Sequence, residues 1–345
     1  MVPPNRVEST PVRISASASL DERTLRDVRE LVETTTEIEG HRPVGEHKYA
    51  HLAVGARGWV GILAHDDDGR LVGYAHTRWN QPGVRPRMAV EVVVHPALHG
   101  PAGDGFVDGG PGVAERLLTE ARAVLARAGG GLLYLWVHRV EDPRTTLAAR
   151  MGFAVQRELA FMTRSLDERG EPAVLPDDIT VRPYREGSDD EAFLEVNNAA
   201  FADHPENGAW DRTTFAERRS LDWFDPDGLF IAWRGEQALA FHWTKWHAHH
   251  SDESPAHEPV GEVYVLAVHP SAQGLGLGRA LLRVGIAHLH DRGCRQAILY
   301  VDCASTGAVG LYRSEGFDLA YREVCYEEDV APQVDSTADL LRPAF

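Results

Sequence analysis

The sequence predicts two mixed α/β domains in tandem, because one order of strands, helices and loops occurs twice along its 345 residues. The strands AVEVVVHP (89–96) and VYVLAVHP (263–270) end in the same His-Pro pair, and each precedes a glycine-rich stretch and an amphipathic helix. Each half then closes with a strand, a short helix ending in Gly-Phe, and a last strand. Strands that alternate with helices in this way predict an α/β class with a mixed sheet (α+β) in each half.

The upstream parts of the two halves correspond as well. Residues 62–79 and 229–246 each have the pattern of a β-hairpin with a polar turn. Each half begins with a helix, at 20–36 and 189–201, whose apolar residues recur at i, i+3 and i+4. A charged stretch broken by proline, DERGEPAVLPDD, separates the halves. The predicted organisation is a flexible arm (1–19), a first domain (20–168), a linker (169–178), a second domain (179–330) and a tail (331–345).

The composition favours a soluble protein without a nucleic-acid partner and does not exclude a small anionic ligand. Hydrophobic residues make up 43% of the chain, and the net charge of −17 argues against a nucleic-acid partner, which would require basic stripes. The three cysteines are an odd number without a CxxC pair, which predicts free thiols in a reducing compartment. We find neither a signal-peptide pattern nor an apolar run near the roughly 20 residues that span a bilayer. We therefore expect a cytoplasmic monomer without a membrane partner.

The loop QGLGLG (273–278) is the most informative motif, with three glycines at alternate positions and Arg279 directly after them. Glycine lets a ligand approach the main chain, and a helix that begins here presents free N–H groups to an anion. These features predict a phosphate-bearing ligand. A P-loop is excluded because no Lys-Ser or Lys-Thr follows, and the glycine spacing does not fit GxGxxG. Tight packing of strand and helix is the alternative role for these glycines.

The His-Pro turn, the Gln-x-x-Gly-x-Gly loop and the Gly-Phe ending, in this order, resemble the GNAT acetyltransferases. The resemblance implies tandem GNAT-type domains and acetyl-CoA as co-substrate, with its pyrophosphate on the loop amides. It also implies that the pantetheine arm pairs with the preceding strand, since an open strand edge can accept an amide-rich ligand. The implied cofactor contacts are Leu266, Ala267, Val268, Gln273, Gly274, Leu275, Gly276, Leu277, Gly278, Arg279, Ser305, Thr306, Gly307, Ala308, Val309 and Gly310.

The first half keeps the scaffold but not the loop. Asp104 and Asp108 stand where a pyrophosphate needs positive potential, and Pro111 interrupts the row of amides. Only the second half is therefore expected to catalyse. The strand of the first half retains backbone for a vestigial cofactor contact at Val92, Val93 and Val94.

Two residues of the second half are candidates for acid–base catalysis, which acetyl transfer to an amine requires. Glu262 lies seven residues before His269, and the aligned position of the first half is Met88. Partial burial at the start of an apolar strand would raise the pKa of such a carboxyl; a solvated strand end is the alternative. Tyr312 precedes the Gly-Phe ending, where the GNAT resemblance places the proton donor to the CoA sulfur. Packing is the alternative role of Tyr312.

Longer motifs resemble one family of tandem GNAT enzymes, the mycothiol synthases, over nearly the whole chain. They are LVETTTEIEGHRPVGE (31–46), VNNAAFADHPENGAWD (196–211), WFDPDGLFIAW (223–233) and FHWTKWH (241–247). The resemblance implies acetyl transfer to the cysteinyl amine of cysteinyl-glucosaminyl-inositol, a small-molecule thiol precursor. The implied substrate contacts are Glu46, Glu206, Lys245, Glu262 and Tyr300. Carboxylates accept hydrogen bonds from sugar hydroxyls and lysine donates them, so these residue types suit that ligand.

Three details qualify this interpretation. Glu46 comes from the first half, so a substrate that bridges the domains is expected, with a solvated loop acid as the alternative. Ser305 stands where the family has Asn; we expect it to cap the next helix but to reach less far toward CoA. The histidines of the loop 247–259 match no defined metal site, so no metal is expected.

Two other functions stay open at this stage. One is a tandem N-acetyltransferase that acts on another small amine, such as an aminoglycoside-like sugar. The other is a non-catalytic acyl-CoA sensor that kept the loop and lost the chemistry.

Overall fold

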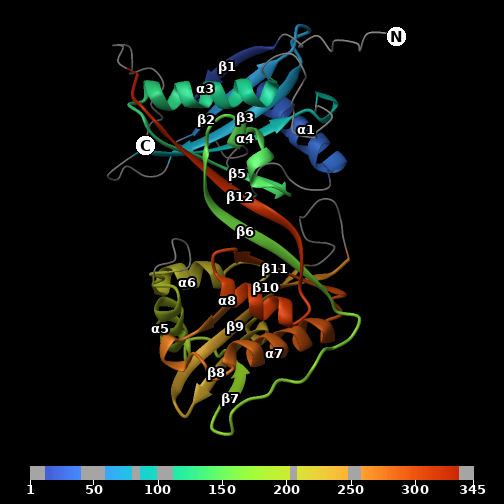
Figure 1. The fold of residues 1–345 in the computed structure, drawn as a ribbon, viewed down its shortest axis with the longest axis vertical. Helices are drawn as coiled ribbons and strands as arrows, with labels where there is room; N and C mark the ends of the chain where they lie inside the picture. Colours follow the sequence, from blue (N-terminus) through green and yellow to red (C-terminus); the bar gives the residue numbers. More distant parts are fainter. Residues whose placement is uncertain are drawn as a thin grey trace. The chain divides into compact units, whose positions relative to one another are not determined.

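The computed structural model describes residues 12–39, 59–79, 86–98, 112–202, 208–247 and 258–333. It divides into two compact units, one of Met1–Glu158 with Arg322–Phe345 and one of Leu159–Tyr321 (Figure 1). Each unit is a mixed sheet covered by helices, as the sequence predicts. The described part of the chain holds no helix with the length and apolar character needed to cross a membrane.

The first unit has the strand order β1-β2-β3-β4-β5-β12, in which β4 and β5 are parallel. Its strands are β1 (Arg13–Ser17), β2 (Trp59–His65), β3 (Leu71–Trp79), β4 (Arg87–Val94), β5 (Gly131–Val140) and β12 (Asp318–Val330), and its helices are α1 (Glu22–Glu39), α3 (Val113–Arg127) and α4 (Leu147–Arg150). The buried face of α3, with Leu117 and Val124, packs against one side of the sheet. Val28 and Leu31 of α1 pack against the other side, beside Tyr74.

The second unit has the strand order β7-β8-β9-β10-β11-β6, in which β10 and β11 are parallel. Its strands are β6 (Ala154–Ser165), β7 (Thr180–Pro183), β8 (Leu229–Arg234), β9 (Gln237–His247), β10 (Val260–Val268) and β11 (Gln296–Asp302), and its helices are α5 (Asp190–Ala200), α6 (Arg212–Arg219), α7 (Leu277–Asp291) and α8 (Thr306–Ser314). Phe193 and Phe215, stacked 4.2 Å apart, join α5 and α6 to one face. Leu282 and Ile286 of α7 and Tyr312 of α8 are buried on the other face.

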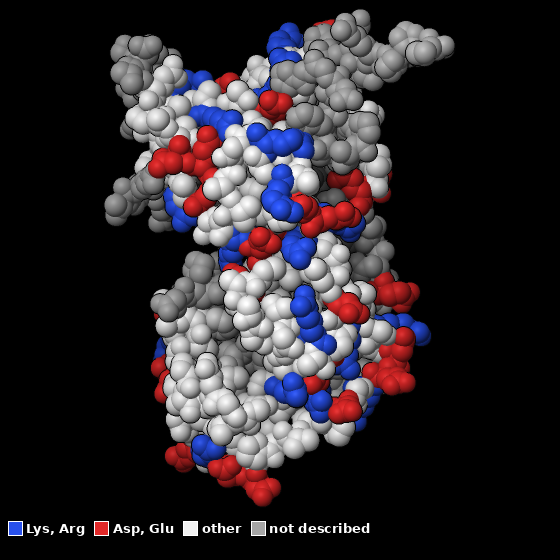
Figure 2. Space-filling model, viewed as in Figure 1, with Lys and Arg blue, Asp and Glu red and all other residues white. Residues whose placement is uncertain are grey.

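The 3-10 turns of the described residues are η1 (Pro96–Leu98), η2 (Pro143–Thr145), η3 (Pro226–Gly228) and η4 (Pro270–Ala272). The predicted hairpins are present as β2–β3 and β8–β9. On the face shown in Figure 2, basic and acidic side chains are interspersed in both units.

Each unit is completed by a strand from the other half of the sequence. The last strand of the first half, β6, pairs with β11, from Ser165 opposite Gln296 to Leu159 opposite Asp302. The last strand of the second half, β12, pairs with β5 of the first unit. The halves 20–168 and 179–330 therefore describe the sequence repeat, whereas the compact units exchange strands. Both copies offer equivalent strand edges, so the apolar pattern does not determine which edge a last strand joins.

Helix α7 approaches β9 closely at Gly285. A Cβ at this position would lie 2.1 Å from Cε1 and 2.2 Å from Nδ1 of His242. His242 is fully buried, and its Nδ1 donates to the Leu281 carbonyl at 2.9 Å. Burial lowers the pKa of His242 to about 4, so the ring is neutral near pH 7. The ring is held in place by α7 and has no room to yield.

We therefore expect Gly285→Ala to destabilise the protein by about 3 kcal/mol, since overpacking a filled core forces side chains and backbone to shift. In an open helix the same change stabilises by roughly 1 kcal/mol. Gly310→Ala in α8 is the matched control, because no atom lies within 4 Å of its added Cβ. Denaturant midpoints measure both variants. Equal midpoints for Gly285→Ala and the wild type would contradict the packing described here.

Candidate active site

The glycine loop connects β10 and the turn η4 to α7. Gly274 and Gly276 have φ angles of +83° and +78°, a left-handed backbone conformation that residues with a Cβ rarely adopt. Leu277 is buried and fixes the first turn of α7, whereas the loop residues 273–276 are exposed. The loop thus presents its main chain, and the free N–H groups of the helix start, to the solvent. This is the arrangement predicted for an anion site.

Arg279 joins the start of α7 to the end of α8. Its Nε lies 3.1 Å from Oε1 of Glu315, and its Nη2 lies 3.0 Å from the hydroxyl of Ser314. Arg283 forms a second, bidentate pair with the same Glu315 at 2.9 and 3.0 Å. The structure gives Arg279 this connecting position; its contact with a cofactor stays a prediction.

The strands β10 and β11 diverge beyond Glu262. Their parallel pairing extends from Val260 opposite Gln296 to Glu262 opposite Ile298. Farther on, β10 continues to Val268 with β9 as its partner among the described strands. Leu266, Ala267 and Val268 therefore line the open side of β10, where the pantetheine arm is expected. The first unit keeps this divergence, because β4 and β5 pair only over Arg87–Val90 and leave Val92, Val93 and Val94 beyond the pairing.

A β-bulge at Tyr264 distinguishes β10 from its counterpart β4. The partner of Val263 is Thr244, whereas the partner of Val265 is Trp243, so Tyr264 is the extra residue. Tyr264 and Val265 both pack against the apolar cluster of α5 and α6. The pairing of β4 with β3 runs without such a shift. Bulges re-aim neighbouring side chains and are frequent beside active sites.

Glu262 lies on the face of the sheet that carries α5 and α6. Its neighbour Gly261 faces Leu289 of α7, so Glu262 points to the opposite side. The Glu262 side chain is 13% exposed, and its Oε2 lies 2.8 Å from Nε2 of His247. Lys245 stands directly opposite on β9, with its Nζ 5.0 Å from the centre of the Trp223 ring.

Tyr300 shares this face, two residues after Ile298 on β11, and is 44% exposed. The structure thus places three of the predicted substrate residues on one face: Lys245, Glu262 and Tyr300. Glu46 and Glu206 lie outside the described residues.

The aromatic neighbours of this face do not follow from the sequence patterns. Phe161 packs 4.9 Å from the ring of Tyr300 and stacks 4.4 Å from that of Tyr321. Phe161 belongs to β6, the strand that comes from the first half, so the repeat alone assigns it to the other unit. Tyr264 packs 4.8 Å from Trp223 and accepts a hydrogen bond from Arg218 at 2.7 Å. Burial raises the pKa of Tyr264.

Tyr312 lies on the other face of the sheet. It is buried 5.8 Å from the Phe317 ring, in the cluster that contains Leu282 of α7. Burial raises its pKa to about 12, so the phenol keeps its proton at neutral pH. Among the described residues its hydroxyl has no hydrogen-bond partner. Glu262 and Tyr312 therefore stand on opposite faces of the sheet, with the divergence of β10 and β11 between them.

The expected capping by Ser305 is wrong. Ser305 occupies the N-cap position of α8, but its side chain makes no capping hydrogen bond. Its ψ of 64° departs from the extended geometry in which a cap side chain reaches the helix amides. Its own N–H donates to the Asp302 carbonyl at 2.9 Å. The side chain is exposed at the start of α8.

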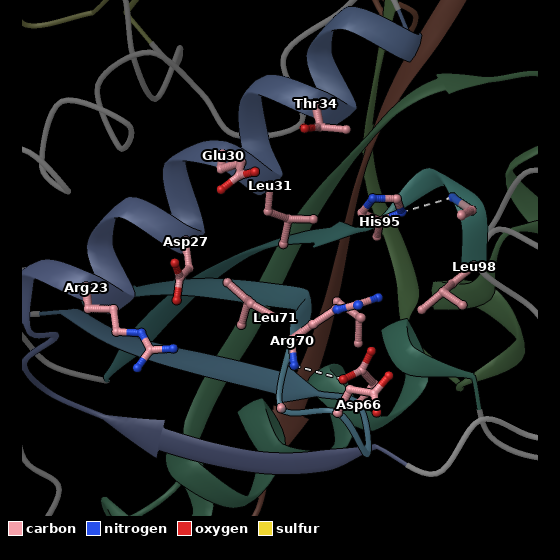
Figure 3. Close-up of a pocket in the computed structure, with 14 residues that line it drawn as sticks. Arg23, Asp27, Glu30, Leu31, Thr34, Asp66, Arg70, Leu71, His95 and Leu98 are labelled. Carbon is pink, nitrogen blue, oxygen red and sulfur yellow. Dashed lines mark hydrogen bonds between the residues drawn. The ribbon is translucent and has the colours of Figure 1, made fainter.

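A separate pocket of about 570 Å³ lies in the first unit, between α1, the turn from β2 to β3, and the residues after β4 (Figure 3). Its lining carries both charge signs, with Arg23, Asp27 and Glu30 on α1 and Asp66 and Arg70 on the turn. None of the predicted site residues that the structure describes lines it. In the described ranges no three His, Cys, Asp or Glu side chains are placed to hold a metal ion. His249, His250 and His257 lie outside these ranges.

Comparisons with known proteins agree with this asymmetric architecture. The model of the acetyltransferase (GNAT) family matches residues 193–317, in the second unit. The mycothiol acetyltransferase of Acidothermus cellulolyticus is 40% identical over 92% of this chain and 94% of its own. That of Nocardia farcinica is 41% identical over 89% and 95%, respectively.

Two solved structures share the fold over nearly the whole chain. A GCN5-related N-acetyltransferase from Sphaerobacter thermophilus has a TM-score of 0.62 at 20% identity, covering 95% of this chain and 99% of its own. A tandem GNAT protein from the clavulanic acid biosynthesis pathway has a TM-score of 0.63 at 16% identity, covering 94% and 100%. The predicted tandem GNAT fold is confirmed. With its full-length similarity to these relatives, the chain belongs to the mycothiol acetyltransferases, a family of GNAT-fold N-acetyltransferases.

Proposed function

We propose that this N-acetyltransferase moves the acetyl group of acetyl-CoA to the cysteinyl amine of cysteinyl-glucosaminyl-inositol, the last step of mycothiol biosynthesis. The observation that carries the proposal is the position of Glu262, the last residue of β10 that pairs with β11, beside Lys245 on one open face. An amine bound on this face meets a carboxylate at the point where the strands open for a thioester. Lys245 and Tyr300 supply polar contacts suited to the hydroxyls of the sugar and the inositol.

The proposed reaction divides acid and base between the two faces of the sheet. Glu262 removes a proton from the ammonium group, and the freed nitrogen lone pair attacks the thioester carbonyl carbon. The attacking nitrogen loses its second proton to solvent, the C–S bond breaks, and Tyr312 gives its proton to the departing sulfur; the phenolate of Tyr312 is then reprotonated from solvent. General acid–base catalysis of this kind contributes typically about 10²–10⁴-fold to a rate. A tyrosine phenol is protonated near neutral pH at its ordinary pKa, and burial raises the pKa of Tyr312 further.

The exposed loop main chain is proposed to bind the pyrophosphate of acetyl-CoA, and Gly278→Ala tests this. The added Cβ would lie 3.6 Å from Leu311 and 3.7 Å from Val268, ordinary contacts that leave the fold intact. It would project between the end of β10 and α8, on the proposed path of the cofactor. We expect the KM for acetyl-CoA to rise roughly tenfold, the scale of one misplaced methyl group in a site. The melting temperature should stay unchanged.

Gly276→Ala is the contrasting variant, because its φ of +78° makes any Cβ costly to the fold itself. It should lose both stability and cofactor affinity. An unchanged KM for acetyl-CoA in Gly278→Ala would show that the cofactor does not bind on this side of the loop.

The function itself is tested by supplying purified protein with acetyl-CoA and cysteinyl-glucosaminyl-inositol. Because this acceptor carries a thiol, the released CoA is quantified by chromatography rather than with a thiol reagent. Glucosaminyl-inositol and an aminoglycoside serve as comparison acceptors. Turnover restricted to such amines would replace the proposed acceptor, and acetyl-CoA binding without any turnover would favour a sensor. Calorimetry should find one acetyl-CoA per chain, in the second unit.

A further inference from the structure

The strands β9 and β10 bring His247 and Glu262 together in a diagonal pair. Val260 is the residue opposite His247, and Lys245 is the residue opposite Glu262. His247 and Glu262 therefore project from the same face of the sheet, displaced by two residues along the strands. Nε2 of His247 lies 2.8 Å from Oε2 of Glu262. The side chains are only 10% and 13% exposed. The contact is therefore well shielded from water.

The chemistry of the pair fixes the direction of its hydrogen bond. An ionised carboxylate only accepts, so Nε2 of His247 carries the hydrogen that is shared with Glu262. The bond occupies Oε2 and leaves Oε1 to meet an amine. At this low exposure, the loss of the hydrogen bond would leave a buried carboxylate oxygen without its partner.

We propose that His247 is a positioning residue for the base: its hydrogen bond holds the Glu262 carboxylate in one orientation, with Oε1 directed to the amine. The inference rests on the proposed function of Glu262. Three other charged or titratable groups on this face contact aromatic rings or a phenol. Lys245 lies over Trp223, Arg218 of α6 donates to the Tyr264 hydroxyl, and Tyr300 packs against Phe161. His247 is the residue hydrogen bonded to Glu262 within the described chain.

The test compares His247→Ala with His247→Gln in the full-length enzyme. Alanine removes the donor, whereas the glutamine amide restores a neutral N–H donor of similar reach. We expect His247→Ala to lower kcat roughly tenfold, a fraction of the whole acid–base contribution, with the KM for acetyl-CoA within about twofold. His247→Gln should recover kcat to within about threefold.

A double-mutant cycle separates positioning from a general structural role. In a Glu262→Gln background, His247→Ala should cost less than about twofold, because residues that act as a unit are not additive. His290→Gln on α7 is the matched control: its Nδ1 lies 3.2 Å from Asp291, and it should leave kcat unchanged. Additive losses, or failure of His247→Gln to recover activity while both variants keep wild-type melting temperatures, would overturn the proposal.

A variant that unfolds is replaced in the cycle by His247→Asn, whose shorter amide N–H group does not reach Glu262 and leaves a smaller cavity than alanine. The proposal for the acceptor and the proposal for His247 can be disproved independently of each other. If wild-type enzyme acetylates a different amine, the same cycle is run with that amine and still decides whether His247 acts through Glu262.

Discussion

Glu262→Gln is expected to lower kcat by about 10²–10³-fold while the affinity for acetyl-CoA stays within twofold of wild type. The amide has the size of the carboxylate, and its oxygen still accepts a hydrogen bond from His247, so the local geometry is preserved. It has no basic lone pair strong enough to remove the ammonium proton. Only the proton-transfer step is therefore removed. Steady-state kinetics with saturating acceptor, together with calorimetry of acetyl-CoA binding, measure the two quantities.

Glu323→Gln is the matched control for this prediction. Glu323 belongs to the first unit, and its Oε1 is 2.9 Å from Nδ1 of His138, so it repeats a histidine–carboxylate pair with residues that are not among the predicted site residues. Its substitution should leave kcat unchanged. A large loss of acetyl-CoA affinity in Glu262→Gln would show instead that Glu262 holds the cofactor strand in place. An unchanged kcat would show that Glu262 is not the base.

Local patterns predicted the elements of the fold, but not how its last strands are assigned. The strand–loop–helix segment is present as β10 and α7, since an apolar strand, a glycine loop and a 3.6-residue repeat are all local signals. The exchange of β6 and β12 is not local. Either copy offers each strand a complementary edge. Only pairs of residues more than 100 positions apart in the sequence, such as Glu328 and Leu133, show which edge is used. The same exchange brings Phe161 to a site that the repeat does not assign to it.

Part of the candidate site could be predicted because its residues lie on adjacent strands with clear sequence patterns. Alignment of the two His-Pro turns singled out Glu262, since the degenerate half has Met88 there. His247 was grouped with a histidine-rich loop, because its place at the end of β9 becomes clear only from the register with Val260. The bulge at Tyr264 likewise leaves no signal in an alternating apolar strand. The pairing register of the strands therefore determines which side chains meet at the site, and composition and motif spacing do not give that register.

Tyr312→Phe is expected to lower kcat by about 10–10²-fold with little change in stability. The ring keeps its packing beside Phe317, and the lost hydroxyl has no hydrogen-bond partner among the described residues, so the folded state loses little. The departing sulfur, however, loses its proton donor. The loss should shrink when acetyl-CoA is replaced by an acetyl thioester of a more acidic thiol, because a better leaving group depends less on protonation.

Tyr326→Phe provides the opposite behaviour as a control. Tyr326 is fully buried in the first unit, and its hydroxyl donates to the Pro143 carbonyl at 2.5 Å. Removing that hydroxyl should cost about 1 kcal/mol of stability and leave kcat unchanged. If Tyr312→Phe behaves in the same way, losing stability but not rate, Tyr312 is a packing residue and the sulfur takes its proton from water. A rate loss that does not depend on the thiol would also exclude the acid role, because a general acid acts through the bond that it helps to break.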